Sequence, residues 1–281
     1  MARIFRVFFD IFFGYFLLIP NLIFFVPVLE NIGIYKYILL FLLCAWNGII
    51  FHYLTLFIHA AAHFNIYPNN RKINDYLSNF LLGYFFLMPI KSYRKKHFKH
   101  HKYLGTVNDP EDSYKYNLNT INFLKWCCFY FPIKKLFLMF FSNENNKSKF
   151  EFEVIISIIV FSSIHLLILN YFINISSIEL YFFLLFIPHT MILPVMNWIR
   201  TSVEHSPVEI NNKSFALRNF DNGSLIISFL FGAAGFKFHD IHHLNPGIHY
   251  LDLFDYKNKF KLQPSTSYAK TISKLYHKSK K

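Results

Sequence analysis

Uncharged, mostly apolar residues are concentrated in four long stretches of the chain. There are 19 in a row at residues 11–29, 22 at 37–58, and 20 each at 154–173 and 180–199. A helix needs roughly 20 such residues to cross a hydrocarbon core about 30 Å thick, and buried helices of soluble proteins rarely contain uncharged runs of this length. We therefore predict four transmembrane helices arranged in two hairpins. Their approximate bounds are 8–29, 34–58, 154–173 and 180–199.

Shorter patterns lie between and after these stretches. The apolar segments 76–90 and 223–236 are too short to cross a bilayer, so we predict that they form short interfacial helices. Residues 117–141 are strongly aromatic but contain three lysines, a pattern typical of a helix lying on the membrane surface. We expect one membrane domain over residues 1–256, followed by a mobile basic tail at 257–281. The predicted fold class is an all-α integral membrane protein.

The distribution of charge predicts which way the hairpins face. The 281 residues are 54% hydrophobic and carry a formal net charge of +13. The two short hairpin loops, 30–36 and 174–179, contain only Lys36 among the basic residues. The rest lie in the segments on the other side, which the positive-inside tendency assigns to the cytoplasm together with both termini. Because topology accounts for the charge, we predict no binding of nucleic acid.

Three clusters of histidine have helical spacing. Residues at i, i+3 and i+4 share one face of a helix, so their rings can point at one place. Each cluster adjoins an apolar segment on the predicted cytoplasmic side, which puts all three at a similar depth. The clusters are His59 with His63, then His97, His100 and His101, and finally His239, His242 and His243.

So many imidazoles indicate a metal site with more than one ion. Imidazole binds zinc, copper, iron and nickel, but a structural zinc takes four ligands and usually includes cysteine. The Glu-x-x-His motif of carboxylate-bridged di-iron bundles is absent from the sequence. A patch that attracts anionic lipids would use lysine, without regular spacing. We therefore predict a histidine-rich dinuclear site, capping the membrane helices at the cytosolic boundary.

The ordered motifs HAAAH, HFKHH and HDIHH resemble the three histidine boxes of the integral-membrane fatty acid desaturase superfamily, which includes hydroxylases and carotenoid ketolases. The resemblance covers residues 37–250. The segment RTSVEH, which ends at His205, is similar to one that many members carry ahead of the third box and that supplies another iron ligand. Residues 108–111 (NDPE) resemble the acidic patch after the second box. The third box begins with His239 rather than the Gln of front-end desaturases, which argues against that subclass.

The resemblance implies a non-haem di-iron centre that uses O₂ to remove hydrogen from an unactivated C–H bond. We expect a desaturase acting on a fatty acyl chain, with electrons from an acidic external donor, a ferredoxin or a cytochrome b5-like protein, drawn to the basic face. A hydroxylase or ketolase acting on a sphingolipid, carotenoid or other lipid is the alternative. A non-catalytic metal-binding or transport protein is a second alternative, although a transporter places its ligands near the bilayer midplane.

For the location of the protein, the bacterial inner membrane is favoured over the endoplasmic reticulum. The expected iron ligands are His59, His63, His97, His100, His101, His205, His239, His242 and His243.

Several charged residues lie close in sequence to these histidines. A carboxylate that accepts the second N–H of a ligating imidazole fixes the orientation of the ring. Arg200 and Glu204 are four residues apart, the spacing of an ion pair on one helix. The candidates for such supporting roles are Asp109, Glu111, Asp112, Arg200, Glu204 and Asp240.

Three other histidines lie inside the predicted membrane helices. They are His52, His165 and His189. An ionisable residue within the membrane is a candidate for function. We expect these rings to be neutral and hydrogen-bonded to a neighbouring helix.

Overall fold

The computed structural model describes most of the chain, and the elements in that part are helices. A few isolated bridges connect loops, but no strand occurs among the described residues. The described ranges are 2–23, 32–111, 113–128, 152–175, 177–207, 215–220, 225–260 and 266–278.

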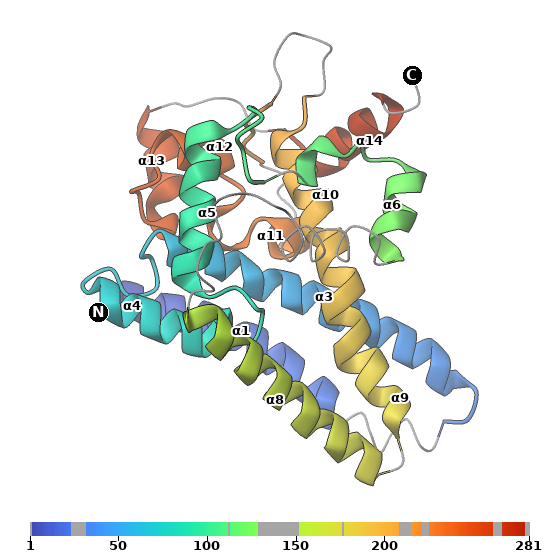
Figure 1. Cartoon of the computed structure of the whole chain (residues 1–281). Helices are drawn as coiled ribbons and strands as arrows, with labels where there is room; N and C mark the ends of the chain where they lie inside the picture. Colours follow the sequence, from blue (N-terminus) through green and yellow to red (C-terminus); the bar gives the residue numbers. More distant parts are fainter. Residues whose placement is uncertain are drawn as a thin grey trace.

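Long apolar helices form one layer of the molecule, drawn obliquely in the lower half of Figure 1. Helix α9 continues through two π-helical segments into α10, so that 178–205 is one unbroken helix. The elements are α1 (Ala2–Ile23), α3 (Tyr35–Ala62), α8 (Phe152–Asn174), α9 (Ile178–Tyr181), η3 (Phe182–Phe186), η4 (Pro188–Ile192) and α10 (Leu193–His205).

Among the described residues, three helices are long and apolar enough to cross a membrane: Tyr35–Ala62, Phe152–Asn174 and Ile178–His205. They match the second, third and fourth predicted spans, and two of them extend further toward the histidine clusters. Helix α1 begins at Ala2 rather than near residue 8. Residues 24–31, the end of the first predicted span, lie outside the described residues. The first transmembrane helix therefore remains a prediction.

Close backbone contacts and buried amides hold this layer together. A Cβ atom added at Gly48 would lie 2.4 Å from Ile192, so glycine allows α3 to approach η4. Asn47 of α3 accepts a hydrogen bond from Asn21 of α1 (2.9 Å) and donates one to the carbonyl oxygen of Leu184 (2.8 Å). Small residues and interhelical hydrogen bonds are the main means of helix association in apolar surroundings.

Shorter elements gather at one end of the long helices, most of them in the upper half of Figure 1, with α4 lower down at the left beside α1. They are α4 (Arg71–Ser78), η1 (Asn79–Gly83), α5 (Ile90–Tyr103), η2 (Ser113–Lys115), α6 (Thr120–Cys127), α11 (Leu225–Phe231), η5 (Ala233–Gly235), α12 (His239–Leu244), η6 (Tyr250–Asp252), α13 (Leu253–Phe260) and α14 (Tyr268–Lys278).

The two short apolar segments are not the single interfacial helices that we expected. In 76–90 the helix ends at Gly83, Leu87 has a left-handed backbone with φ of 53°, and α5 begins at Ile90. In 223–236 helix α11 ends at Phe231, and a 3₁₀ turn follows in which Ala234 is left-handed. Left-handed residues interrupt a helix. Of 117–141, residues 120–127 form α6, and those beyond 128 lie outside the described residues.

The C-terminal segment is more ordered than its lysine content suggested. Helix α14 packs near α10, with Tyr268 and Leu275 buried. Tyr268 stacks on Phe220 with 3.8 Å between ring centroids, and its hydroxyl donates to the carbonyl oxygen of Phe231. The expectation of a mobile tail is therefore wrong for residues 268–278. The apolar face of α14 outweighs its lysines because it covers the end of the bundle.

Hydrogen bonds from Arg94 attach the end of α3 to α5. The Arg94 guanidinium donates to the carbonyl oxygens of Ala62 (2.7 Å) and Ala61 (3.2 Å), and it also pairs with Asp75 of α4. The last carbonyls of a helix have no partner within it and favour a cation. Since α3 and α5 each carry a histidine cluster, these hydrogen bonds from Arg94 help to fix the two clusters relative to each other.

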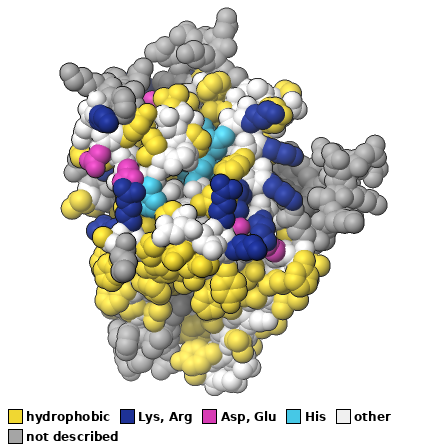
Figure 2. All heavy atoms as spheres, turned by 90° about the vertical axis from the view of Figure 1, so that its left-hand side faces the viewer, with side chains coloured by type: hydrophobic (Ala, Val, Ile, Leu, Met, Phe, Trp, Pro, Cys, Tyr) yellow, Lys and Arg dark blue, Asp and Glu magenta, His cyan; other side chains and the backbone are white. Residues whose placement is uncertain are grey.

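One face of the molecule divides into an apolar part and a charged part. In Figure 2 hydrophobic side chains cover the lower part of the face, and lysine and arginine side chains lie above them with histidines visible between. This division suits a molecule whose lower layer lies in lipid and whose upper layer is in water.

We predict that Asp75→Ala destabilises the protein by about 3 kcal/mol, because it leaves Arg94 largely buried without its carboxylate. The melting temperature of the protein in detergent measures the loss. The control is Lys91→Ala, which breaks a pair with Glu153 in which the lysine side chain is 59% exposed, and it should cost less than about 1 kcal/mol. Equal melting temperatures for Asp75→Ala and the unmodified protein would contradict the prediction.

Candidate metal centre

The three histidine clusters and His205 meet where four helices come together. His59 lies in the last turn of α3, and His63 is the residue that ends this helix. The second cluster occupies the C-terminal half of α5, His205 is the last residue of α10, and the third cluster lies on the short helix α12. Helical spacing within each cluster turns the rings of one helix toward the rings of the others.

Five rings form a first group. Nε2 of His97 lies 2.9 Å from Nε2 of His63 and 2.9 Å from Nε2 of His101, whose Nε2 lies 3.2 Å from that of His242. The ring of His59 completes the group, with its centroid 4.4 Å from that of His97 and 4.5 Å from that of His242. One nitrogen from each ring lies within 4.8 Å of one nitrogen of every other.

Four rings form a second group beside the first. Nε2 of His205 lies 3.2 Å from Nε2 of His100 and 3.0 Å from Nε2 of His239, which in turn lies 3.0 Å from Nε2 of His243. The rings of His101 and His243 stack with 4.2 Å between centroids, so the groups touch. All nine predicted ligands therefore lie in two adjacent groups.

The donor atoms of these groups fit a metal better than they fit each other. A neutral imidazole has one N–H donor and one acceptor nitrogen, so rings that direct Nε2 at a common point cannot all be satisfied by mutual hydrogen bonds. His59 is 6% exposed, and neither of its nitrogens has a hydrogen-bond partner among the described residues. Unpaired buried nitrogens are costly unless a cation accepts their lone pairs.

Burial keeps these histidines in the form that binds metal. Desolvation lowers the pKa of His97, His239 and His242 well below the ordinary range, and the neighbouring imidazoles lower it further. The pKa of His101 is lowered to about 3 by desolvation first and then by His63. A neutral ring has a free lone pair, which is the state that coordination requires.

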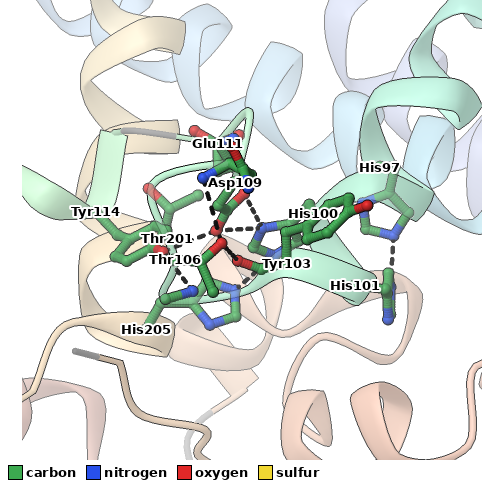
Figure 3. A network of polar contacts seen from close by, with 12 residues as sticks. His97, His100, His101, Tyr103, Thr106, Asp109, Glu111, Tyr114, Thr201 and His205 are labelled. Atoms are coloured by element: carbon green, nitrogen blue, oxygen red, sulfur yellow. Dashed lines mark hydrogen bonds and ion pairs between the residues drawn. The ribbon is translucent and has the colours of Figure 1, made fainter. Parts of the chain in front are cut away.

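Asp109 orients one of the rings, as Figure 3 shows. Its carboxylate accepts from Nδ1 of His100 (3.0 Å), from the hydroxyl of Tyr114 (2.7 Å) and from the backbone N–H of Glu111 (2.9 Å). Burial by itself raises the pKa of Asp109, but these hydrogen bonds outweigh it and the net shift is downward. An ionised Asp109 fixes the proton of His100 on Nδ1 and leaves Nε2 free for the centre.

Glu204 is a second carboxylate at the centre. It is fully buried, its Oε2 pairs with Arg200 at 2.5 Å, and the same oxygen lies 3.7 Å from Nε2 of His239. Glu204, His205 and His239 form one of the groups whose ligand atoms lie within 4.8 Å of one another. The structure therefore brings Glu204 within reach of a metal in the second group, and it contains the ion pair expected between Arg200 and Glu204.

The remaining candidate acids are Asp240, Glu111 and Asp112. Asp240 accepts a hydrogen bond from Asn219 at 3.4 Å. Glu111 accepts hydrogen bonds from Ser113 and supports the loop that carries Asp109. Asp112 lies outside the described residues.

Residues that motif reasoning missed hold His205 in place. Arg218 donates to the carbonyl oxygens of Val203 and Ser206, at 2.6 and 2.5 Å. The Nδ1 atom of His205 lies 3.3 Å from the carbonyl oxygen of Ala216. Arg218 therefore caps the last turn of α10 in the way that Arg94 caps α3. No sequence signal indicated it, because it belongs to none of the boxes.

Metal affinity should depend on the carboxylate behind His100. We predict that Asp109→Asn lowers the affinity of the centre for a metal ion such as iron by about 10- to 100-fold, since the amide does not fix the imidazole tautomer as a carboxylate does. Competition with a chelator, with iron measured by elemental analysis, tests this. The control is Asp240→Asn, because the described partner of Asp240 is an asparagine. Equal losses in the two variants would contradict the assignment.

The metal-free protein should lose stability as the pH falls below about 6.5. Unfolded histidines take up protons near that pH, whereas burial keeps His97, His239 and His242 neutral in the fold. The unfolded state then binds more protons, so the free energy of unfolding falls by up to about 1.4 kcal/mol per histidine for each pH unit. Melting temperatures of chelator-treated protein between pH 5 and 8 measure this. A melting temperature that stays constant or rises on acidification would contradict it.

Comparison with known proteins agrees with this arrangement. The family model described as fatty acid desaturase matches residues 36–272, which covers all nine histidines. A β-carotene 4-ketolase from Protosiphon botryoides is 35% identical over 77 residues. That match covers 27% of this chain and 20% of the relative. No solved structure matches the chain significantly. Because the family model spans most of the sequence and includes every box, the chain belongs to the fatty acid desaturase family.

Proposed function

We propose that this protein is a membrane-bound, O₂-dependent oxidoreductase with two iron ions, which introduces a double bond into a fatty acyl chain. The observation that carries the proposal is the convergence of nine histidine nitrogens into two touching groups. Such a donor set, without cysteine, suits two imidazole-bound metals. Family membership supports iron as the metal.

The proposed first ion is held by the group of five rings and the second by the group of four, with Glu204 available to the latter. When bound, the two irons would activate O₂, which is the oxidant, so that hydrogen can be removed from an unactivated C–H bond. The protein contributes position and environment. Asp109 directs Nε2 of His100 inward, Arg200 balances the charge of Glu204, and buried helix ends exclude bulk water. Excluding water protects an oxidising centre from side reactions.

The membrane placement in this proposal follows from apolar length and charge. Helix α1 would join the three candidate spans as the fourth, and the shorter elements would form the cytosolic cap. Both histidine groups and both termini then face the cytoplasm, most simply of a bacterial inner membrane. A lipid chain would reach the irons from the bilayer, so the substrate need not enter water.

An acidic electron donor fits the exposed face of α5. Lys95, Lys96, Lys99 and Lys102 are exposed on this helix, which also carries His97, His100 and His101. Figure 2 shows lysine and arginine side chains around the visible histidines. A positive surface beside the centre would steer an acidic ferredoxin or cytochrome b5-like protein to it.

Ketone formation is the second candidate, and one specific observation favours it. A β-carotene 4-ketolase is 35% identical to this chain over 77 residues. Desaturation, hydroxylation and ketone formation can all begin with removal of the same hydrogen atom. The scaffold therefore accommodates each, and the product distinguishes them.

Expression in a host of defined lipid composition should yield a new lipid product, identified by mass spectrometry. Loss of two hydrogens indicates desaturation, gain of one oxygen indicates hydroxylation, and exchange of two hydrogens for one oxygen indicates a ketone. We expect His242→Ala to abolish the product while membrane insertion persists. His277→Ala, at an exposed position on α14, is the control and should retain activity. Purified protein with stoichiometric zinc and no O₂-dependent turnover would contradict the proposal.

A further inference from the structure

A second group of polar side chains lies inside the membrane layer, away from the metal centre. His189 of η4 and His165 of α8 are 8% and 7% exposed, and their ring centroids are 5.6 Å apart. A hydrogen bond of 3.0 Å joins Nδ1 of His165 to the hydroxyl of Tyr181, as we expected for a histidine in a membrane helix. The Nδ1 atom of His189, by contrast, has no hydrogen-bond partner among the described residues.

Two nitrogens in this group lack partners among the described residues. They are Nδ1 of His189 and Nε2 of His165, and both atoms are buried. In hydrocarbon no water compensates a missing hydrogen bond, and an unpaired polar group costs several kcal/mol. Histidines inside membrane segments are rare for this reason and usually have a function.

The surroundings of His189 form an aromatic box. Its ring centroid lies between 5.2 and 5.4 Å from four phenyl rings contributed by α3, by the turn after η1 and by α8. These rings belong to Phe51, Phe85, Phe86 and Phe161. These rings pack directly against His189, so the surroundings of the two nitrogens are apolar and the nitrogens are the polar groups that could fix the orientation of a lipid oxygen.

The backbone at this place is also irregular. Among the described residues, three segments are π-helical, and two of them, η3 and η4, follow each other in the membrane helix that carries His189. The third, η1, leads into the turn with Phe85 and Phe86. π-Helical turns are rare and occur frequently at functional sites. Here His189, one of the two histidines of this group with an unpaired nitrogen, lies in such a turn.

We propose that His165 and His189 bind a hydroxyl or carbonyl oxygen on a lipid, within the membrane layer. A neutral imidazole can donate from one nitrogen and accept at the other, so the pair matches such an oxygen. Phe51 lies eight residues before the ligand His59 on α3, about 12 Å of helix rise. His189 lies sixteen residues before the ligand His205 on the unbroken helix 178–205, about 24 Å of rise. Resting on the proposed function, the inference is that the enzyme's substrate carries an oxygen roughly 12 to 24 Å from the carbon that reacts.

Binding of matched probes to the full-length protein in detergent tests this inference without turnover. The probes are a radiolabelled long-chain acyl ester and a set of the same ester with one hydroxyl at successive chain positions. We expect one hydroxylated probe to bind about tenfold more tightly than the parent, the contribution of one net hydrogen bond. This preference should disappear in His189→Leu, decrease in His165→Leu and survive in part in His189→Gln.

Thr190→Val is the matched control, because Thr190 lies on the same π-helical turn and its hydroxyl already donates to the carbonyl oxygen of Phe186. It should retain the preference. Equal binding of all probes to the unmodified protein, as an ordered water at the histidines would give, overturns the inference, and so does a preference that persists in His189→Leu. Tight binding of a hydroxylated probe with no O₂-dependent product would overturn the proposed function alone. Turnover without any preference would overturn this inference alone.

Discussion

Nine imidazoles that face one another in a buried place are the constraint on which the rest of the fold depends. Their lone pairs converge within about hydrogen-bonding distance, and most of the rings are nearly inaccessible to water. Burial keeps the rings neutral, but without a cation the arrangement leaves nitrogens unpaired. The geometry therefore has to be imposed by the surrounding helices. Four helices end or begin at this point, and contacts outside the motifs themselves hold three of them, α3, α5 and α10.

Those contacts follow a common pattern. Arg94 caps the end of α3 from α5, and Arg218 caps the end of α10 from a downstream loop. Each arginine satisfies carbonyl groups that a helix end leaves free, and each fixes the backbone that carries a histidine. Asp109 contacts a ligand side chain directly, because its carboxylate accepts a hydrogen bond from the ring of His100. The centre is thus held by two arginines that cap helix ends and by one carboxylate. Each of these residues lies at most 33 positions along the sequence from the group it contacts.

Regular spacing and apolar length made much of this predictable from the sequence. The i, i+3, i+4 histidines predicted which side chains would share a face. Uncharged runs predicted four helices of spanning length, of which three are found among the described residues. Breaks inside apolar segments were not predictable, because the left-handed residues Leu87 and Ala234 are not typical of such positions. Arg94 and Arg218 were missed because their role depends on carbonyls brought to them by the tertiary fold. The packed helix α14 was not predicted, because its many lysines drew attention away from the apolar residues on its other face.

The metal centre and the intramembrane histidines lie at different depths of the helix bundle, and the proposals give them different roles. Helix ends at the boundary with water hold the metal ligands, and the π-helical part of the membrane layer holds a polar group for the lipid. X-ray absorption at the iron edge tests the central claim most directly. The account predicts two irons per chain, with nitrogen as the dominant ligand and no sulfur. A single metal ion per chain, or ligation that includes cysteine sulfur, would contradict it.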